Sequence, residues 1–246
     1  VIVQASNQFS FDNVISLLAL KCTGRVVVEI SRAAAKSLGG YKVHSKSEDF
    51  KVFLKHSNDR IELTIEDVDY TKRQKKTSKK ILTSLSSSNN LFDALKSLLK
   101  FADEHSKSTN DSETAYVFIE LPETVSDLLF DSENATISIN DTFLNSVNIK
   151  SNNLKANFDA SSEFVRCTIK SNNLTATFPA AAQLQDMTIK SNNSKVNILR
   201  TASFDGVFDI ESTILKSNIP ISGHNKNRCI KIKSNKLRLN IQDESY

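Results

Sequence analysis

One short motif, Ile-Lys-Ser-Asn-Asn, recurs in the second half of this chain and constrains its fold more than any other feature. The copies begin at Ile149, Ile169 and Ile189, so they lie 20 residues apart. A shorter Lys-Ser-Asn triplet returns at Lys216 and Lys233. A fixed period of this length indicates one structural unit that is repeated along the chain and stacked on its neighbours.

Apolar and polar residues alternate on both sides of each copy, which is the period of a half-buried strand. Each unit is therefore predicted to be a strand, a polar corner and a second strand. We expect the asparagines to turn the corner, because asparagine tolerates the left-handed backbone conformation. The apolar positions of the first unit are Val147, Ile149, Leu154, Ala156 and Phe158, and the next units repeat them.

A single unit cannot fold alone. Its roughly five inward side chains contribute ~1.5–3 kcal/mol each, whereas ordering roughly twenty residues costs ~1.5 kcal/mol apiece. The predicted fold is therefore all-β, a single parallel β-solenoid with rungs of about 20 residues. A right-handed coil is expected from the general preference of parallel crossovers. N-terminal rungs would span 1–70 and C-terminal rungs 114–246, within one continuous domain.

Residues 71–113 depart from the strand pattern and are predicted to be an insertion. Leucines at helical spacing indicate one amphipathic helix, with Leu91, Leu95, Leu98 and Leu99 on its apolar face. We favour this helix as a cap or brace over exposed core, with a surface anchor as the alternative. A basic run precedes it and could contact a membrane surface or an acidic partner, or be a solvated loop: Lys72, Arg73, Lys75, Lys76, Lys79 and Lys80.

Three features resemble the putative-adhesin β-solenoid domain family, whose function is unknown. They are the early Thr23-Gly24 corner, the strand from Tyr116 that ends in Leu121-Pro122, and the 20-residue units with Ser-Asn or Ser-Glu-Asn corners. The family usually has Ser-Gly at those corners, so this chain departs from it there. The resemblance implies a role at a bacterial cell envelope or surface, and it supplies no catalytic residues.

Stacking would bring the repeated lysines together in a lysine stripe: Lys150, Lys170, Lys190, Lys216 and Lys233. Two interpretations remain open. The stripe could bind a polyanion such as a lipid headgroup surface, teichoic acid or nucleic acid. It could instead be a by-product of repeat duplication that keeps a sheet edge soluble. Nucleic acid is the least favoured partner, because no aromatic residues alternate with the lysines as stacking platforms.

Other functional classes find little support in the sequence. Net charge is only +4, and the three cysteines, Cys22, Cys167 and Cys229, form neither a disulfide framework nor a metal knuckle. No apolar run is long enough to span a membrane. No cofactor, metal or nucleophile motif occurs, so we expect a non-enzymatic binding module. A structural subunit of a larger assembly is the alternative; a carbohydrate-active β-helix enzyme would need clustered carboxylates and is disfavoured.

Overall fold

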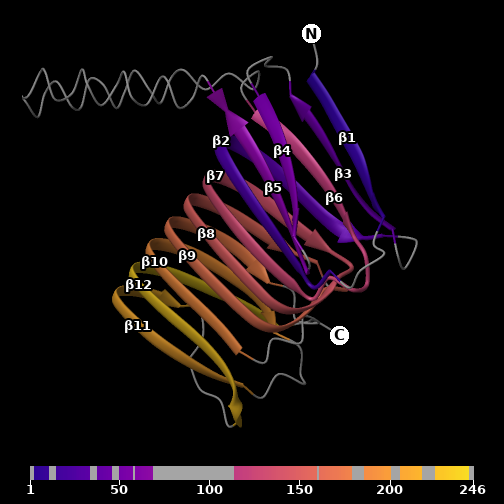
Figure 1. Ribbon diagram of the computed structural model, residues 1–246. Coiled ribbons are helices and arrows are strands. Elements are labelled where there is room, and N and C mark those ends of the chain that lie inside the picture. The colour runs from indigo at the N-terminus through magenta and orange to yellow at the C-terminus, as the bar shows by residue number, and fades with distance from the viewer. Residues whose placement is uncertain are drawn as a thin grey trace, which may run out of the picture.

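The computed structural model describes residues 3–10, 15–33, 38–45, 50–57, 59–68, 114–159, 161–178, 186–200, 206–217 and 225–243. In this part of the chain the protein is all-β, and twelve strands form one sheet in the order β1-β3-β6-β2-β7-β8-β9-β10-β12-β11, with β5 and β4 branching from β2 (Figure 1). Most neighbours are parallel, which confirms the predicted class. The predicted helix and basic run of 71–113 lie outside the described residues, and the hand of the coil stays a prediction.

The strands have the following bounds: β1 Val3–Ser10, β2 Leu17–Arg32, β3 Leu38–Ser45, β4 Phe50–Ser57, β5 Arg60–Asp67, β6 Thr114–Leu121, β7 Asp127–Asn140, β8 Phe143–Phe158, β9 Glu163–Phe178, β10 Asp186–Arg200, β11 Gly206–Ser217 and β12 Asn225–Asp243.

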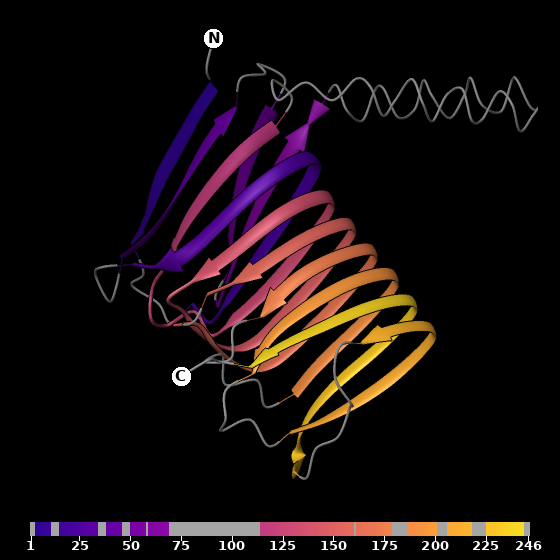
Figure 2. The same cartoon turned by 180° about the vertical axis from the view of Figure 1, so that it is seen from behind.

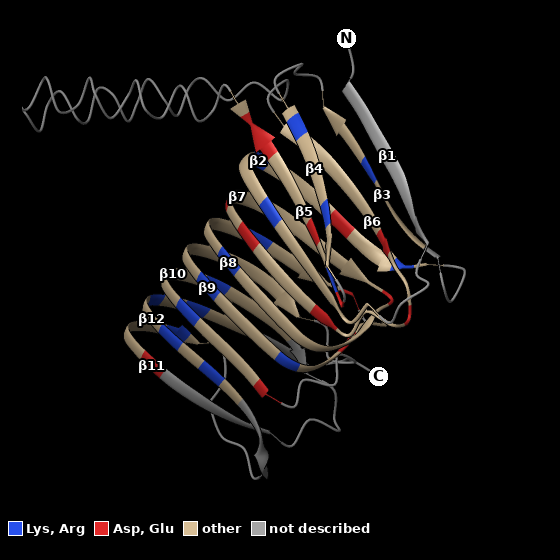
Figure 3. Ribbon diagram, in the orientation of Figure 1, with Lys and Arg blue, Asp and Glu red and all other residues tan. Residues whose placement is uncertain are grey.

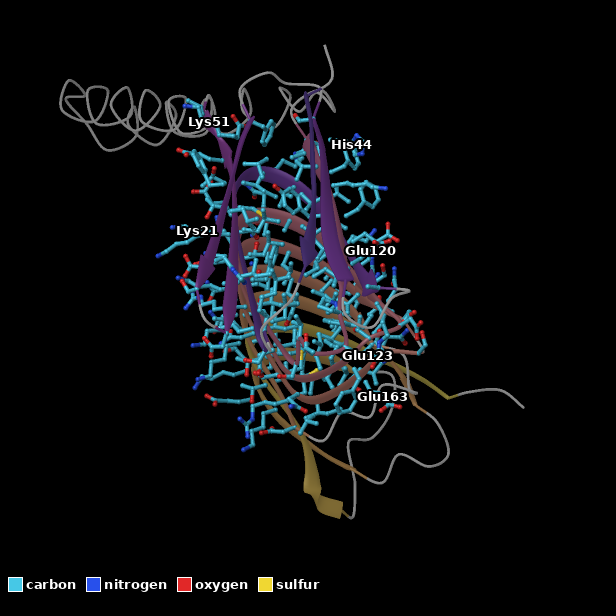
Figure 4. All side chains as sticks on the ribbon, turned by 45° about the vertical axis from the view of Figure 1, so that its right-hand side comes forward. Lys21, His44, Lys51, Glu120, Glu123 and Glu163 are labelled. Atoms are coloured by element: carbon cyan, nitrogen blue, oxygen red, sulfur yellow. The ribbon has the colours of Figure 1, made fainter. Side chains whose placement is uncertain are left out.

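The repeating unit is one long strand that bends once, and β8 is its clearest example. Its first arm runs to Lys150, its corner is Ser151–Asn153, and its second arm begins at Leu154. Both arms pair in parallel with β7 on one side and β9 on the other. Stacked arms therefore form two layers joined at the bends (Figure 2), with side chains filling the space between them (Figure 4).

The corner serine holds the bend. The Ser151 hydroxyl donates to the carbonyl of Asn153 at 3.0 Å, and Ser171 and Ser191 do the same two residues on, at 2.8 and 2.9 Å. Among the described residues, Asp141 is the single non-glycine residue with positive φ. The expectation that asparagines turn the corner in a left-handed conformation was therefore wrong, because the serine closes a bend whose backbone stays in the strand.

Inward side chains of successive rungs stack on each other and form the core. Ile149 lies opposite Ile169 and then Ile189, and all three are fully buried. At the end of the second arms the rings of Phe158 and Phe178 stack with centroids 4.7 Å apart. The alternation in the sequence therefore predicted correctly which face of each strand is buried.

The N-terminal end of the stack is built from separate strands. The first arm of β2 pairs with β5 and its second arm pairs with β6, so β5 and β6 together make one rung. Ile65 of β5 and Thr114 of β6 lie opposite Cys22 and Arg25, on either side of the β2 corner. Beyond this rung β3 pairs antiparallel with β6, β4 pairs antiparallel with β5, and β1 pairs antiparallel with β3.

The corner of β2 needs glycine. Gly24 has φ of +84°, and a Cβ atom added there would lie 2.9 Å from the Cβ atom of Asp67. The Asp67 backbone N–H donates to the Thr23 hydroxyl at 3.0 Å, which ties the neighbouring rung to this corner. The Thr23-Gly24 corner that the sequence indicated is therefore present.

At the C-terminal end the chain does not stack in sequence order. β12 lies between β10 and β11, and it pairs in parallel with both. Within this arrangement Ser212 of β11 lies opposite Ser234 of β12, and its hydroxyl donates to the carbonyl of Ile214 at 2.9 Å. The corner of β11 is therefore at Ser212.

Candidate polyanion-binding surface

Four of the five lysines of the predicted stripe do stack. Lys150 lies opposite Lys170, Lys170 opposite Lys190, and Lys190 opposite Lys233. All four are exposed at the end of the first arm, directly before the corner. Neighbouring strands lie ~4.8 Å apart, so these ammonium groups crowd along one line. We call Lys150, Lys170, Lys190 and Lys233 the lysine column, and Figure 3 shows basic bands side by side across β8, β9, β10 and β12.

Lys216 is not part of this column. The register places it opposite Arg238, on the second arm of β11, because that strand bends at Ser212. Glu211 takes the column position in β11, and its carboxylate accepts from the Lys233 ammonium at 2.8 Å. At the other end Asp131 lies opposite Lys150. The column is therefore a run of like charges that ends beside a carboxylate on each side.

Two asparagine ladders run along the corners beside the column. In one ladder Asn172 and Asn192 each donate to the amide oxygen of the residue below, Asn192 at 3.1 Å. In the other ladder Asn153, Asn173 and Asn193 each donate to the amide oxygen below, at 2.6, 2.7 and 3.0 Å. Stacked asparagines therefore tie each rung to the next by amide hydrogen bonds.

A groove of about 950 Å³ lies on the other side of the corners, along the outer face of the second arms. One wall follows the second asparagine ladder: Arg25, Asn134, Asn153, Asn173, Asn193 and Lys236. The floor is Val26, Ala135, Leu154, Leu174, Ser194 and Leu237. The opposite wall is Val27, Thr136, Lys155, Thr175, Lys195, Arg238 and Lys216. Each row is a register column of the sheet, so the groove crosses the rungs.

The charged side chains of the groove are all basic. Its described lining contains six basic residues and no carboxylate: Arg25, Lys155, Lys195, Lys216, Lys236 and Arg238. All six are exposed. The sequence prediction did not include this surface, apart from Lys216. The sequence nevertheless contains a pattern that indicates this surface, since Lys155, Thr175 and Lys195 recur at the same 20-residue period as the stripe.

Three labelled glutamates lie on another side of the molecule. Figure 4 shows Lys21 pointing outward on the side opposite to Glu120, Glu123 and Glu163. Nearby, the Asp159 carboxylate accepts hydrogen bonds from Ser161 and Ser162, at 2.7 and 2.6 Å. Burial opposes ionisation of Asp159, but hydrogen bonds from Ser162, Ser161 and the Asp141 N–H outweigh it and lower the pKa of this carboxyl.

Metal binding and thiol nucleophilicity have no support in the described residues. They contain no group of three or more His, Cys, Asp and Glu side chains that could hold a metal ion. Cys22 and Cys167 are free and buried. Burial raises the pKa of both thiols, to about 12 for Cys167, so neither is a reactive nucleophile. The side chain of Cys229 lies outside the described residues.

The last strand of the stack exposes apolar side chains. Ile214 and Leu215 of β11 are 49% and 43% exposed, although Leu215 stands in the inward column opposite Leu237. Within the described structure no further strand covers it. The end of the stack therefore leaves part of a core column open to solvent.

Comparison with known proteins finds distant structural neighbours. No family model matches the chain, and no curated protein matches it significantly. A solved structure described as a putative cell adhesion protein from Clostridium sporogenes is 12% identical, with a TM-score of 0.49, over 99% of this chain and all of its own. A putative adhesin from Bacteroides fragilis is 7% identical, with a TM-score of 0.35, over 98% of this chain and 97% of its own.

A third neighbour, a putative adhesin from Parabacteroides merdae, is 6% identical with a TM-score of 0.32, over 98% of this chain and 96% of its own. At these values the likeness carries no inference about a ligand, so the proposals below rest on the residues of this chain. In the described part of the protein, no helix has both the length and the apolar character to cross a bilayer.

Proposed function

We propose that this protein is a non-enzymatic, adhesin-like binding module that attaches to a polyanionic surface through the lysine column. The observation that supports this is the register that sets lysine opposite lysine across β8, β9, β10 and β12. Unit charges 4–5 Å apart repel by about 1 kcal/mol in water. Anions bound along the column would attract the ammonium groups and offset the repulsion between neighbouring lysines.

The geometry of the column favours a partner with many closely spaced charges. Its four ammonium groups are exposed and lie along one line, so they can engage a surface together. Several weak contacts made at once give much higher affinity than each contact alone. A lipid bilayer with anionic headgroups presents such a surface, and juxtaposed basic residues contribute about 1 kcal/mol each to its binding.

The proposal is tested by vesicle binding with two matched double variants. Lys150→Glu/Lys190→Glu reverses two charges of the column, and Lys155→Glu/Lys195→Glu reverses two charges on the same strands, β8 and β10, in the groove. Sedimentation with vesicles of phosphatidylglycerol and phosphatidylcholine should show binding that is lost in the column variant and retained in the groove variant. Equal loss in both variants, or binding to phosphatidylcholine alone, would refute attachment through the column.

A second candidate function is a structural subunit of a larger assembly. It is favoured by Ile214 and Leu215, which stand exposed on the last strand, β11. An exposed strand edge can pair with a strand of another chain. Sedimentation velocity at rising concentration should then show association that Leu215→Lys abolishes. A monomer at every concentration, together with no partner retained from the native extract, would count against this function.

A further inference from the structure

We infer that the groove on the second arms binds a single extended chain of an acidic polysaccharide, in which charged sugars alternate with neutral ones. This site is distinct from the lysine column, because the corner serines and the first asparagine ladder, Asn152, Asn172 and Asn192, lie between them. The inference does not depend on the column binding a surface. It rests on the shape of the groove, its amide groups and the order of its charges.

The shape of the groove favours a linear polymer. Each wall and the floor are columns of the sheet, so the cross-section repeats from rung to rung. The groove continues from Arg25 on β2 to Lys216 on β11, and its rungs lie ~4.8 Å apart. A ligand that repeats along its own length can therefore make the same contact on each rung.

Recognition in this groove has to come from side chains. The backbone N–H and C=O groups of β7, β8, β9 and β10 are paired with the strands above and below. A peptide could not add to the sheet here, because strand addition needs a free edge. The side chains that are available are amides, hydroxyls and cations.

The asparagine ladder leaves hydrogen-bonding capacity unused. An amide side chain has two N–H donors and an oxygen with two lone pairs. Asn153 and Asn173 each donate once to the rung below and accept once from the rung above. One N–H and one lone pair per residue therefore remain for a ligand. Neighbouring hydroxyls of a sugar ring offer the matching acceptor and donor.

Charge along the opposite wall alternates in the middle of the groove. Thr136 of β7, Lys155 of β8, Thr175 of β9 and Lys195 of β10 follow one another in register. Lys155 and Lys195 are therefore two rungs and roughly 10 Å apart, which is twice the strand spacing. Beyond them Arg238 of β12 and Lys216 of β11 continue the wall with a cation on each rung. With no carboxylate in the described lining, a polymer with an acid on every second sugar is complementary.

Nucleic acid fits this surface less well. Binding of single strands depends on aromatic side chains that stack on successive bases. Tyr116, at one end, is the one aromatic side chain in the described lining. A chain of sugars needs no such series of platforms.

The test measures binding of soluble polymers by calorimetry. Hyaluronan oligosaccharides carry one carboxylate per two sugars, dextran is neutral, and inorganic polyphosphate is charged without sugar hydroxyls. We expect hyaluronan to bind, and Lys155→Glu/Lys195→Glu to weaken it at least tenfold. Lys150→Glu/Lys190→Glu should change it less than threefold. An equal loss in both variants, or polyphosphate binding as tightly as hyaluronan, would overturn the assignment.

A second pair of variants removes amides without changing charge. Asn173 lines the groove, whereas Asn172 on the same corner lies in the other ladder, and each takes part in two ladder hydrogen bonds. Asn173→Ala should weaken hyaluronan binding about fivefold, whereas Asn172→Ala should leave the binding unchanged. Both variants should lower the free energy of unfolding by a similar amount. Equal effects of the two on hyaluronan binding would overturn the proposal. Vesicle binding is measured in parallel. If the protein does not bind vesicles, that result contradicts the function proposed for the lysine column and not the assignment of the groove.

Discussion

Replacement of the central lysine of the column should stabilise the protein and weaken its attachment to an anionic surface. Lys170 lies between Lys150 and Lys190, so it takes part in two repulsive contacts. Lys170→Glu converts both into attractions like the one between Lys233 and Glu211, which is 2.8 Å long. Stability and binding would then change in opposite directions.

The size of the gain follows from the strand spacing. At ~4.8 Å each charge pair is worth at most about 0.9 kcal/mol in water. Reversing the sign of two pairs therefore bounds the change at roughly 3.5 kcal/mol. Exposed ion pairs deliver much less than this bound, typically ~0.2–1 kcal/mol, since the side chains move apart. We expect a gain of about 1 kcal/mol at low salt.

Urea denaturation at low and high salt measures this gain. Lys170→Gln removes the repulsion without adding attraction, so its gain should be about half as large. At 1 M salt the Debye length is about 3 Å, and both gains should almost vanish. A variant that is no more stable than the parent at low salt, or a gain that salt does not reduce, would refute the electrostatic reasoning.

Three further predictions concern the scaffold. Gly24→Ala should lower the free energy of unfolding by about 2–4 kcal/mol in urea denaturation, since a left-handed residue costs ~1–2 kcal/mol and the new Cβ atom meets Asp67; a loss under ~0.5 kcal/mol would contradict this. Cys22 and Cys167 should react with a thiol reagent at pH 8 only after unfolding, and fast labelling of the native protein at either residue, located by mass spectrometry, would contradict their burial. The pKa of Asp159 is lowered in the folded protein, so this carboxylate stabilises the protein above its ordinary pKa of 3.8, and the stabilisation is lost as pH falls through the folded value. Asp159→Asn should lower the free energy of unfolding at neutral pH and reduce its further loss below pH 3.8. Parallel curves of unfolding free energy against pH for the variant and the parent would refute this.

Much of the repeated part of the fold could be predicted from residue patterns. The alternation around Ile149 and Ile169 sets which side chains face inward, because the side-chain period of a strand is two. The 20-residue period then places Lys150, Lys170 and Lys190 on one line. The same reasoning applied to Lys155, Thr175 and Lys195 would have located one wall of the groove.

The corner shows a limit of reasoning by residue type. Asparagine suits left-handed turns in general, so the Asn152-Asn153 pair suggested such a turn. In the folded chain the Ser151 hydroxyl closes the bend by donating to the carbonyl of Asn153. The Asn152 amide oxygen accepts from Asn172 of the next rung, and Asn153 accepts from Asn173 and donates to Asn134. A hydrogen bond between rungs depends on a neighbour that the local sequence does not specify.

The order of the outer rungs was settled by packing between distant segments. A strand with one apolar face can stack on any other such strand, so the local pattern does not choose its neighbour. Hence β12 could insert between β10 and β11, and β5 and β6 could pair with β2 on the side away from β7. The same choice set the register of β11, whose corner lies at Ser212 and not at the Lys216-Ser217-Asn218 triplet that matches the repeat motif. Pairing with β12 selected Ser212, which put Glu211 at the end of the lysine column and Lys216 in the groove.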